Sequence, residues 1–83
     1  MVHELKIRSE YFKDVANLTK TFEVRKDDRN FQVLDRIVLR EVDTNGNYTG
    51  FGEDCEITCI LGRKEEEKQY VVDGYVIMGI KLL

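Results

Sequence analysis

The chain lacks any apolar run near the roughly 18–20 residues that a membrane-spanning helix needs. It also lacks the charged-then-apolar start of a signal peptide, so a cytoplasmic protein without a membrane partner is expected. The glycine motifs of Rossmann and P-loop nucleotide sites are absent, which excludes both classes. With 83 residues, a single domain covering 1–83 is predicted and a large multi-domain enzyme is excluded.

Metal-binding side chains are scarce, because the chain has one histidine and two cysteines. Cys55 and Cys59 lie in a strand-like segment, where four residues span about 13 Å, too far for a disulfide that needs alpha carbons within about 7 Å. We expect both to be small core residues on the face of Ile57 and Leu61. His3 lies on an apolar strand face and is predicted to be packed or half-exposed rather than to act in catalysis. No metal and no cofactor are expected.

Charge is distributed unevenly along the chain, whose net charge is −3. Residues 1–19 are neutral, 20–40 carry a net +2, and 41–83 carry a net −5. A nucleic-acid-binding surface is usually basic, so only the middle segment could supply one. The negative net charge of the whole chain argues against tight, non-specific binding to nucleic acid.

Hydrophobic periodicity predicts a mostly β protein with one or two short helices. Ser9 is expected to cap a helix, whose core face would include Tyr11. Asn45-Gly46 predicts a hairpin turn. The helix is expected at 10–18, the strands at 3–7, 21–26, 36–42, 48–51, 53–61 and 75–82, with a helical turn or loop at 31–35 and a solvated loop or helix fragment at 62–69. Five or six strands in so short a chain favour a small pseudo-barrel, because closure removes exposed sheet edges.

The strand at 21–26 is the segment most suited to chemistry. Phe22 and Val24 are expected to face the core, which would place Glu23 and Arg25 together on the other face, with Lys20 at the strand entrance. A carboxylate among cations can orient a guanidinium for bidentate binding of a phosphate or a base edge. A simple surface ion pair is the structural alternative.

The segment Lys20-Thr-Phe-Glu23-Val-Arg25 resembles the Lys-x-x-Glu-x-Arg element of ASCH (activating signal cointegrator homology) domains, a branch of the PUA-like superfamily. The stretches 28–33 and 73–80 strengthen the resemblance to a small bacterial and phage-associated group often labelled RNA-binding. The resemblance implies a pseudo-barrel with a cleft lined by Lys20, Glu23 and Arg25. Two glycines usual in that family are replaced here by Leu18 and Leu34.

The leading hypothesis is a module that binds RNA or a nucleotide-like ligand in this cleft. Lys20 and Arg25 would contact phosphates or base edges, and Glu23 would orient them. Three further cations would attract the ligand electrostatically: Lys26, Arg29 and Arg40. Tyr48, which lies in a Tyr-Thr-Gly element resembling one in the family, would stack against a base.

Two alternatives remain open. One is a small ASCH-type hydrolase of a modified nucleoside or of RNA, with Lys20 and Glu23 as catalytic residues. The Lys-x-x-Thr pattern of ASCH-like amidohydrolases has its threonine where this chain has Glu23, which argues against an enzyme. The other is a protein-interaction module that docks through the acidic second half.

Overall fold

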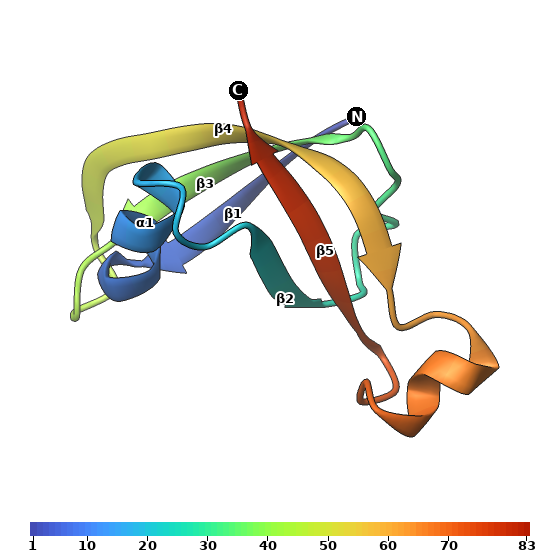
Figure 1. Ribbon diagram of the computed structural model, residues 1–83. Helices are drawn as coiled ribbons and strands as arrows, with labels where there is room; N and C mark the ends of the chain where they lie inside the picture. Colours follow the sequence, from blue (N-terminus) through green and yellow to red (C-terminus); the bar gives the residue numbers. More distant parts are fainter.

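A computed structural model describes residues 1–83 and shows one curled β-sheet with a short helix (Figure 1). The elements in chain order are β1 (Val2–Arg8), α1 (Ser9–Ala16), β2 (Phe22–Lys26), β3 (Arg36–Val42), β4 (Tyr48–Leu61), the 3-10 helix η1 (Glu65–Gln69) and β5 (Tyr75–Leu82). The prediction of a mostly β fold with one or two short helices is confirmed. No helix is both long and apolar enough to cross a membrane.

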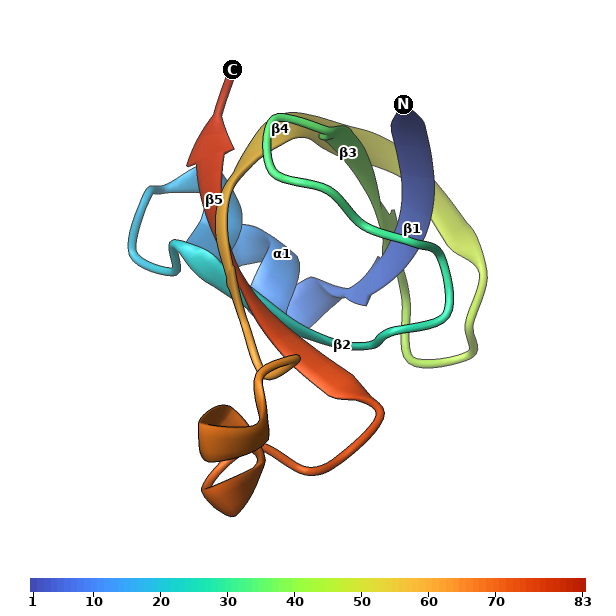
Figure 2. The same cartoon turned by 90° about the vertical axis from the view of Figure 1, so that its right-hand side faces the viewer.

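The five strands form a single sheet in the order β1-β3-β4-β5-β2. β1 runs parallel to β3, and the other neighbours are antiparallel. The sheet curls until its two edge strands, β1 and β2, face each other, and α1 lies across one opening (Figure 2). This is a half-closed barrel, in agreement with the predicted pseudo-barrel.

The gap between β1 and β2 is closed by arginine side chains instead of a strand ladder. Arg25 Nη2 donates to the carbonyl oxygen of Lys6 at 2.7 Å, and Arg29 Nη1 donates to that of Glu4 at 2.9 Å. Guanidinium groups therefore satisfy carbonyls that an unpaired edge strand would otherwise expose. We call this junction the β1–β2 seam.

The core fills the inside of the curl and takes residues from every strand except β2. Alternation along β1 and β5 brings their apolar side chains to this inner face, as expected. The buried core cluster consists of Leu5, Ile7, Phe12, Val15, Phe31, Ile37, Leu39, Cys55, Ile57, Val76, Met78 and Ile80.

The orientation predicted for β2 is wrong. Phe22 and Val24 are 47% and 54% exposed, whereas Glu23 is only 4% exposed and faces the inside of the curl. Period-2 alternation identifies residues that share a face but cannot tell which face is inside. Here Lys20 and Arg25 neutralise the inward carboxylate, so the charged face can be buried at the seam.

The prediction for the second cysteine is also wrong. Cys55 and Ile57 are buried as expected, but Cys59 is exposed and Leu61 is more than one-third exposed. A register irregularity lies between Ile57 and Cys59 in the β4–β5 ladder, and a bulge of this kind reverses the alternation beyond it. Both cysteines are free, as the strand spacing predicted.

Three smaller expectations need correction. The helix ends at Ala16, and its N-cap is Arg8 rather than Ser9, because Arg8 has an extended backbone and Ser9 is already the first helical residue. The Ser9 hydroxyl donates instead to the carbonyl oxygen of Val42 at 3.0 Å. Tyr11 is exposed rather than in the core. The two segments expected at 48–51 and 53–61 form one continuous strand, β4.

Candidate ligand-binding pocket

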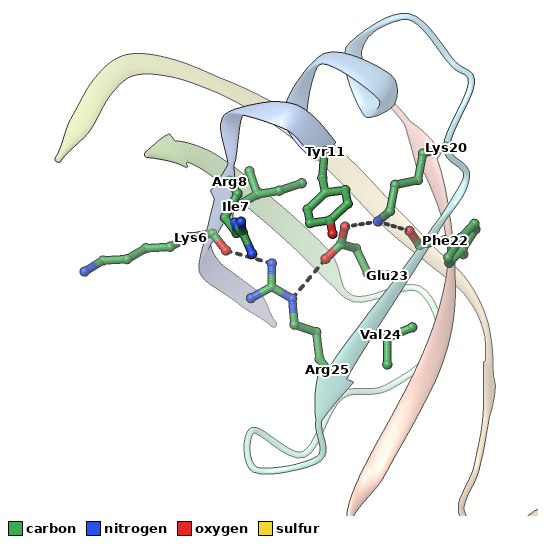
Figure 3. Close-up of a pocket in the computed structure, with 9 residues that line it drawn as sticks. All are labelled: Lys6, Ile7, Arg8, Tyr11, Lys20, Phe22, Glu23, Val24 and Arg25. Carbon is green, nitrogen blue, oxygen red and sulfur yellow. Dashed lines mark hydrogen bonds and ion pairs between the residues drawn. The ribbon is translucent and has the colours of Figure 1, made fainter. Parts of the chain in front are cut away.

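A pocket of about 490 Å³ opens at the β1–β2 seam, beside the first turn of α1 (Figure 3). Its walls come from β1, α1 and β2, segments brought together by the curl of the sheet. They combine four cations and one carboxylate with aromatic and aliphatic groups. The lining residues are Lys6, Ile7, Arg8, Tyr11, Lys20, Phe22, Glu23, Val24 and Arg25.

Glu23 is the centre of the polar network in this pocket. Its Oε1 accepts a hydrogen bond from the ammonium of Lys20, and its Oε2 accepts one from Arg25 Nε at 3.0 Å. A buried carboxylate is costly unless its charge is paired, and here both oxygens are paired. Glu23 therefore holds two cations in place at the pocket wall.

The local sequence explains how three charged groups reach one point. Glu23 and Arg25 are two residues apart on β2, so their side chains leave the same face of the strand (Figure 3). Lys20 precedes the strand and turns back, donating to the carbonyl oxygen of Phe22 at 2.6 Å as well as to Glu23. All three residues line the pocket, and their role in binding a ligand stays a prediction.

Donors remain available for a ligand. Arg25 uses Nε for Glu23 and Nη2 for Lys6, which leaves Nη1 without a protein acceptor. The ammonium of Lys20 has three N–H groups and uses two of them. A fixed guanidinium next to an ammonium can donate to the oxygens of one anionic group.

Aromatic rings stand beside these cations. The Nζ of Lys20 lies 5.7 Å from the ring centroid of Tyr11 and 4.9 Å from that of Phe22. The guanidinium carbon of Arg8 lies 5.8 Å from the centroid of Tyr11. In Figure 3 the side chains of Phe22 and Val24 point away from Glu23, so they contribute to the outer margin of the pocket.

Four residues named in the sequence hypothesis lie outside this pocket. Lys26 is exposed at the end of β2, and Arg29 closes the seam by its bond to the Glu4 carbonyl. Arg40 pairs with the carboxylate of Glu4 at 2.8 Å, an interaction that raises the pKa of Arg40, and its guanidinium covers the ring of Tyr48.

Sequence reasoning missed Lys6, Arg8 and Tyr11 as pocket residues. The outward alternation of Glu4, Lys6 and Arg8 on β1 is visible in the sequence. Nothing local places that strand beside β2, because the two strands are at opposite ends of the sheet order and meet only through its curl.

No group of three or more histidine, cysteine, aspartate or glutamate side chains is arranged to hold a metal ion. His3 is buried against the ring of Phe31, and its Nε2 lies 2.8 Å from Asp35 Oδ2, so it is the packed rather than the half-exposed histidine of the two that the sequence left open.

The curled five-stranded sheet and its short helix form a small α+β pseudo-barrel, and the pocket lies at the β1–β2 seam of this fold. The chain belongs to the family described as "Domain of unknown function (DUF3850)", whose model matches residues 2–80. It is 32% identical over 71 residues to an uncharacterized 12.9 kDa protein in the GpA 3' region of Escherichia phage P2. That alignment covers 86% of this chain and 64% of the phage protein, so the chain spans less than two thirds of its relative.

The fold is also found in a solved structure. The crystal structure of hypothetical protein PH0355 matches with a TM-score of 0.63 and 17% identity, covering 100% of both chains. At this level of identity, the match concerns the fold alone.

Proposed function

We propose that this chain is a binding module for RNA or a nucleotide-like ligand, held in the pocket at the β1–β2 seam. The observation that carries the proposal is the Arg25 guanidinium, held by Glu23 and the Lys6 carbonyl, with Nη1 left to donate. The resemblance of Lys20, Glu23 and Arg25 to the ASCH element supports the same assignment. The small bacterial and phage-associated group that the chain resembles is also often labelled RNA-binding.

The chemistry of the walls suits a phosphate-bearing ligand with a flat ring. The two cations of Lys20 and Arg25 outnumber the one carboxylate of Glu23 with which they pair, so the positive charge at this wall of the pocket attracts an anion. Lys20 and Arg25 would donate to phosphate oxygens or to base edges, while Tyr11 and Phe22 offer surfaces on which a base can stack.

The hydrolase alternative is less well supported by this arrangement. Both oxygens of Glu23 already accept hydrogen bonds from cations, which suits a residue that orients its neighbours. A general base needs a carboxylate oxygen within hydrogen-bonding distance of the proton it removes. We therefore assign Glu23 a positioning role in ligand binding.

The test is fluorescence anisotropy of a labelled single-stranded RNA octamer with the wild-type chain between about 50 and 200 mM salt. With about three or four phosphate contacts, log K should fall with log salt at a slope of about −2 to −3. Arg25→Met should weaken binding at least ~10-fold, because it removes a charge-assisted donor. Glu23→Gln should also weaken binding, by releasing both cations.

Arg36→Met is the matched control, since Arg36 is exposed on β3, away from the pocket. It should change the affinity much less than Arg25→Met does. Far-UV circular dichroism of each variant separates loss of binding from loss of fold. The proposal is wrong if no RNA or nucleotide binds at the lowest salt, or if a folded Arg25→Met variant binds as well as wild type.

A further inference from the structure

A second group of cations around an aromatic ring lies outside the pocket, on the outer side of the sheet. Tyr48, at the start of β4, is 48% exposed. The guanidinium carbon of Arg40 lies 4.1 Å from the centroid of its ring, and Lys6 Nζ lies 5.4 Å from it. These are cation–π distances, so two cations from neighbouring strands converge on one ring.

An ion pair holds the arginine over Tyr48, just as an ion pair with Glu23 holds Arg25 in the pocket. Arg40 Nη1 donates to Glu4 Oε1 at 2.8 Å, which fixes the guanidinium that lies over Tyr48. In both places a carboxylate orients an arginine, and an aromatic ring lies close to a cation. Lys6 has no carboxylate partner, so its ammonium is the cation most available to a ligand.

Lys6 connects the two places. Its carbonyl oxygen accepts the hydrogen bond from Arg25 in the pocket, while its side chain points away from Glu23 (Figure 3) and ends beside Tyr48. Arg8, on the pocket wall, is in register with Val42, which is in register with Tyr48. Arg8 and Tyr48 are therefore two strand spacings apart, roughly 10 Å.

The charges along this path are mixed but favour an anion. Arg8 is paired with Glu10 at 2.9 Å and Arg40 with Glu4, which leaves the charge of Lys6 uncompensated. A path of aromatic rings with cations between them is the arrangement that holds single-stranded nucleic acid, because bases stack on rings while cations contact the phosphates.

We infer that the ligand is a single-stranded oligonucleotide of several residues rather than a mononucleotide, and that it runs from the pocket over β1 to Tyr48. This inference rests on the proposed function. One base occupies the pocket beside Tyr11, a second stacks against Tyr48, and the intervening phosphates lie near Lys6 and Arg8. A duplex is excluded as the ligand, since its stacked bases are not free to reach two separate rings.

The test compares uridine monophosphate with oligouridylates of increasing length, by titration calorimetry or by competition against a labelled octamer. The affinity should rise at least ~5-fold from the mononucleotide to the tetranucleotide, since a second stacked base adds binding energy. Tyr48→Leu should abolish most of that gain and leave the affinity for the mononucleotide unchanged. Lys6→Met should also reduce the gain with length, because it removes the ammonium beside Tyr48.

Two controls keep the result specific. Tyr48→Phe preserves the ring and should retain the gain with length, and Tyr70→Leu replaces another exposed tyrosine, outside the path, and should have no effect. Equal affinity for the mononucleotide and the tetranucleotide, or a tetranucleotide affinity unchanged in Tyr48→Leu, overturns the inference but leaves the proposed function intact. Tighter binding of duplex than of single-stranded RNA also overturns it. Failure of every nucleotide to bind overturns both.

Discussion

Two leucines lie in backbone conformations that normally favour glycine. Leu18 has a φ of +67° and Leu34 a φ of +77°, and their side chains are 63% and 72% exposed. An L-residue in the left-handed region costs roughly 1–2 kcal/mol, and an exposed side chain recovers little of this by burial. These are the two positions at which the family resemblance leads us to expect glycine. The chain therefore differs from the family at these positions only in the side chain, because the backbone keeps the turn conformation that glycine favours.

We predict that Leu18→Gly and Leu34→Gly each stabilise the fold by about 0.5–1 kcal/mol, because relief of the strain exceeds the added entropy of the unfolded chain. The free energy of unfolding, measured by urea titration, tests this. The control is Val33→Gly, at a half-exposed neighbour without a positive φ, which should destabilise the fold. Equal destabilisation by all three substitutions would contradict the prediction.

At the scale of the element, a bulge in β4 decides which of its side chains face outward. The break in register between Ile57 and Cys59 turns Cys59 outward, where it lies against Gly79 of β5. A Cβ on Gly79 would approach Cys59 Sγ to 2.7 Å and Thr58 Oγ1 to 2.6 Å, so the bulge and the glycine fit each other. One strand therefore carries one buried and one exposed thiol.

The two thiols should differ in reactivity. Burial raises the pKa of Cys55 to about 11, so its reactive thiolate is scarce at pH 8, whereas Cys59 is open to solvent. We predict that a disulfide-exchange reagent such as Ellman's reagent modifies one thiol rapidly in the folded protein and the second only in denaturant. Cys59→Ala should abolish the rapid phase. Two thiols reacting at the same rate without denaturant would mean that β4 has no such bulge.

At the scale of the whole molecule, Asp35 ties the start of β1 to the start of β3. Its Oδ2 lies 2.8 Å from His3 Nε2 and accepts from the backbone N–H of Gln32 at 3.0 Å, while its Oδ1 lies 3.2 Å from the N-terminal ammonium. The hydrogen bond with His3 is the main reason that the pKa of Asp35 falls to about 2 from an ordinary 3.8. The ionised carboxylate is thus the form that the folded chain favours.

This lowered pKa sets an acid limit on stability. The contribution of Asp35 is present above its unfolded pKa of 3.8 and is lost as the pH falls toward 2. We predict that the wild type loses stability between these values more steeply than Asp35→Asn does, as measured by urea titration at each pH. Asp28→Asn, at an exposed aspartate, is the control and should follow the wild type. The pKa values of Asp27 and Glu67 are also lowered, and both residues are present in the wild type and in Asp35→Asn, so their contribution is common to the two curves. If the stability of wild type and of Asp35→Asn falls in parallel with pH, this role of Asp35 is contradicted.

Much of this protein follows from local sequence pattern. Alternation along residues 75–82 predicted the inward side chains of β5, and Asn45-Gly46 predicted the turn between β3 and β4, because side-chain period and turn conformation depend on near neighbours. The charged trio of Lys20, Glu23 and Arg25 was also found from the sequence, since two of its members are two residues apart on one strand.

Only the tertiary structure decided which side of β2 faces inward and what stands opposite it. The alternation of apolar and polar residues along that strand fits either face being buried. The face with Glu23 is the buried one, because Glu23 pairs with two cations where the sheet curls upon itself. The same curl brings Lys6 and Arg8 of β1 to the pocket and carries the path onward to Tyr48. Contacts between the two ends of a sheet depend on its twist and bulges, which depend in turn on the packing of all five strands.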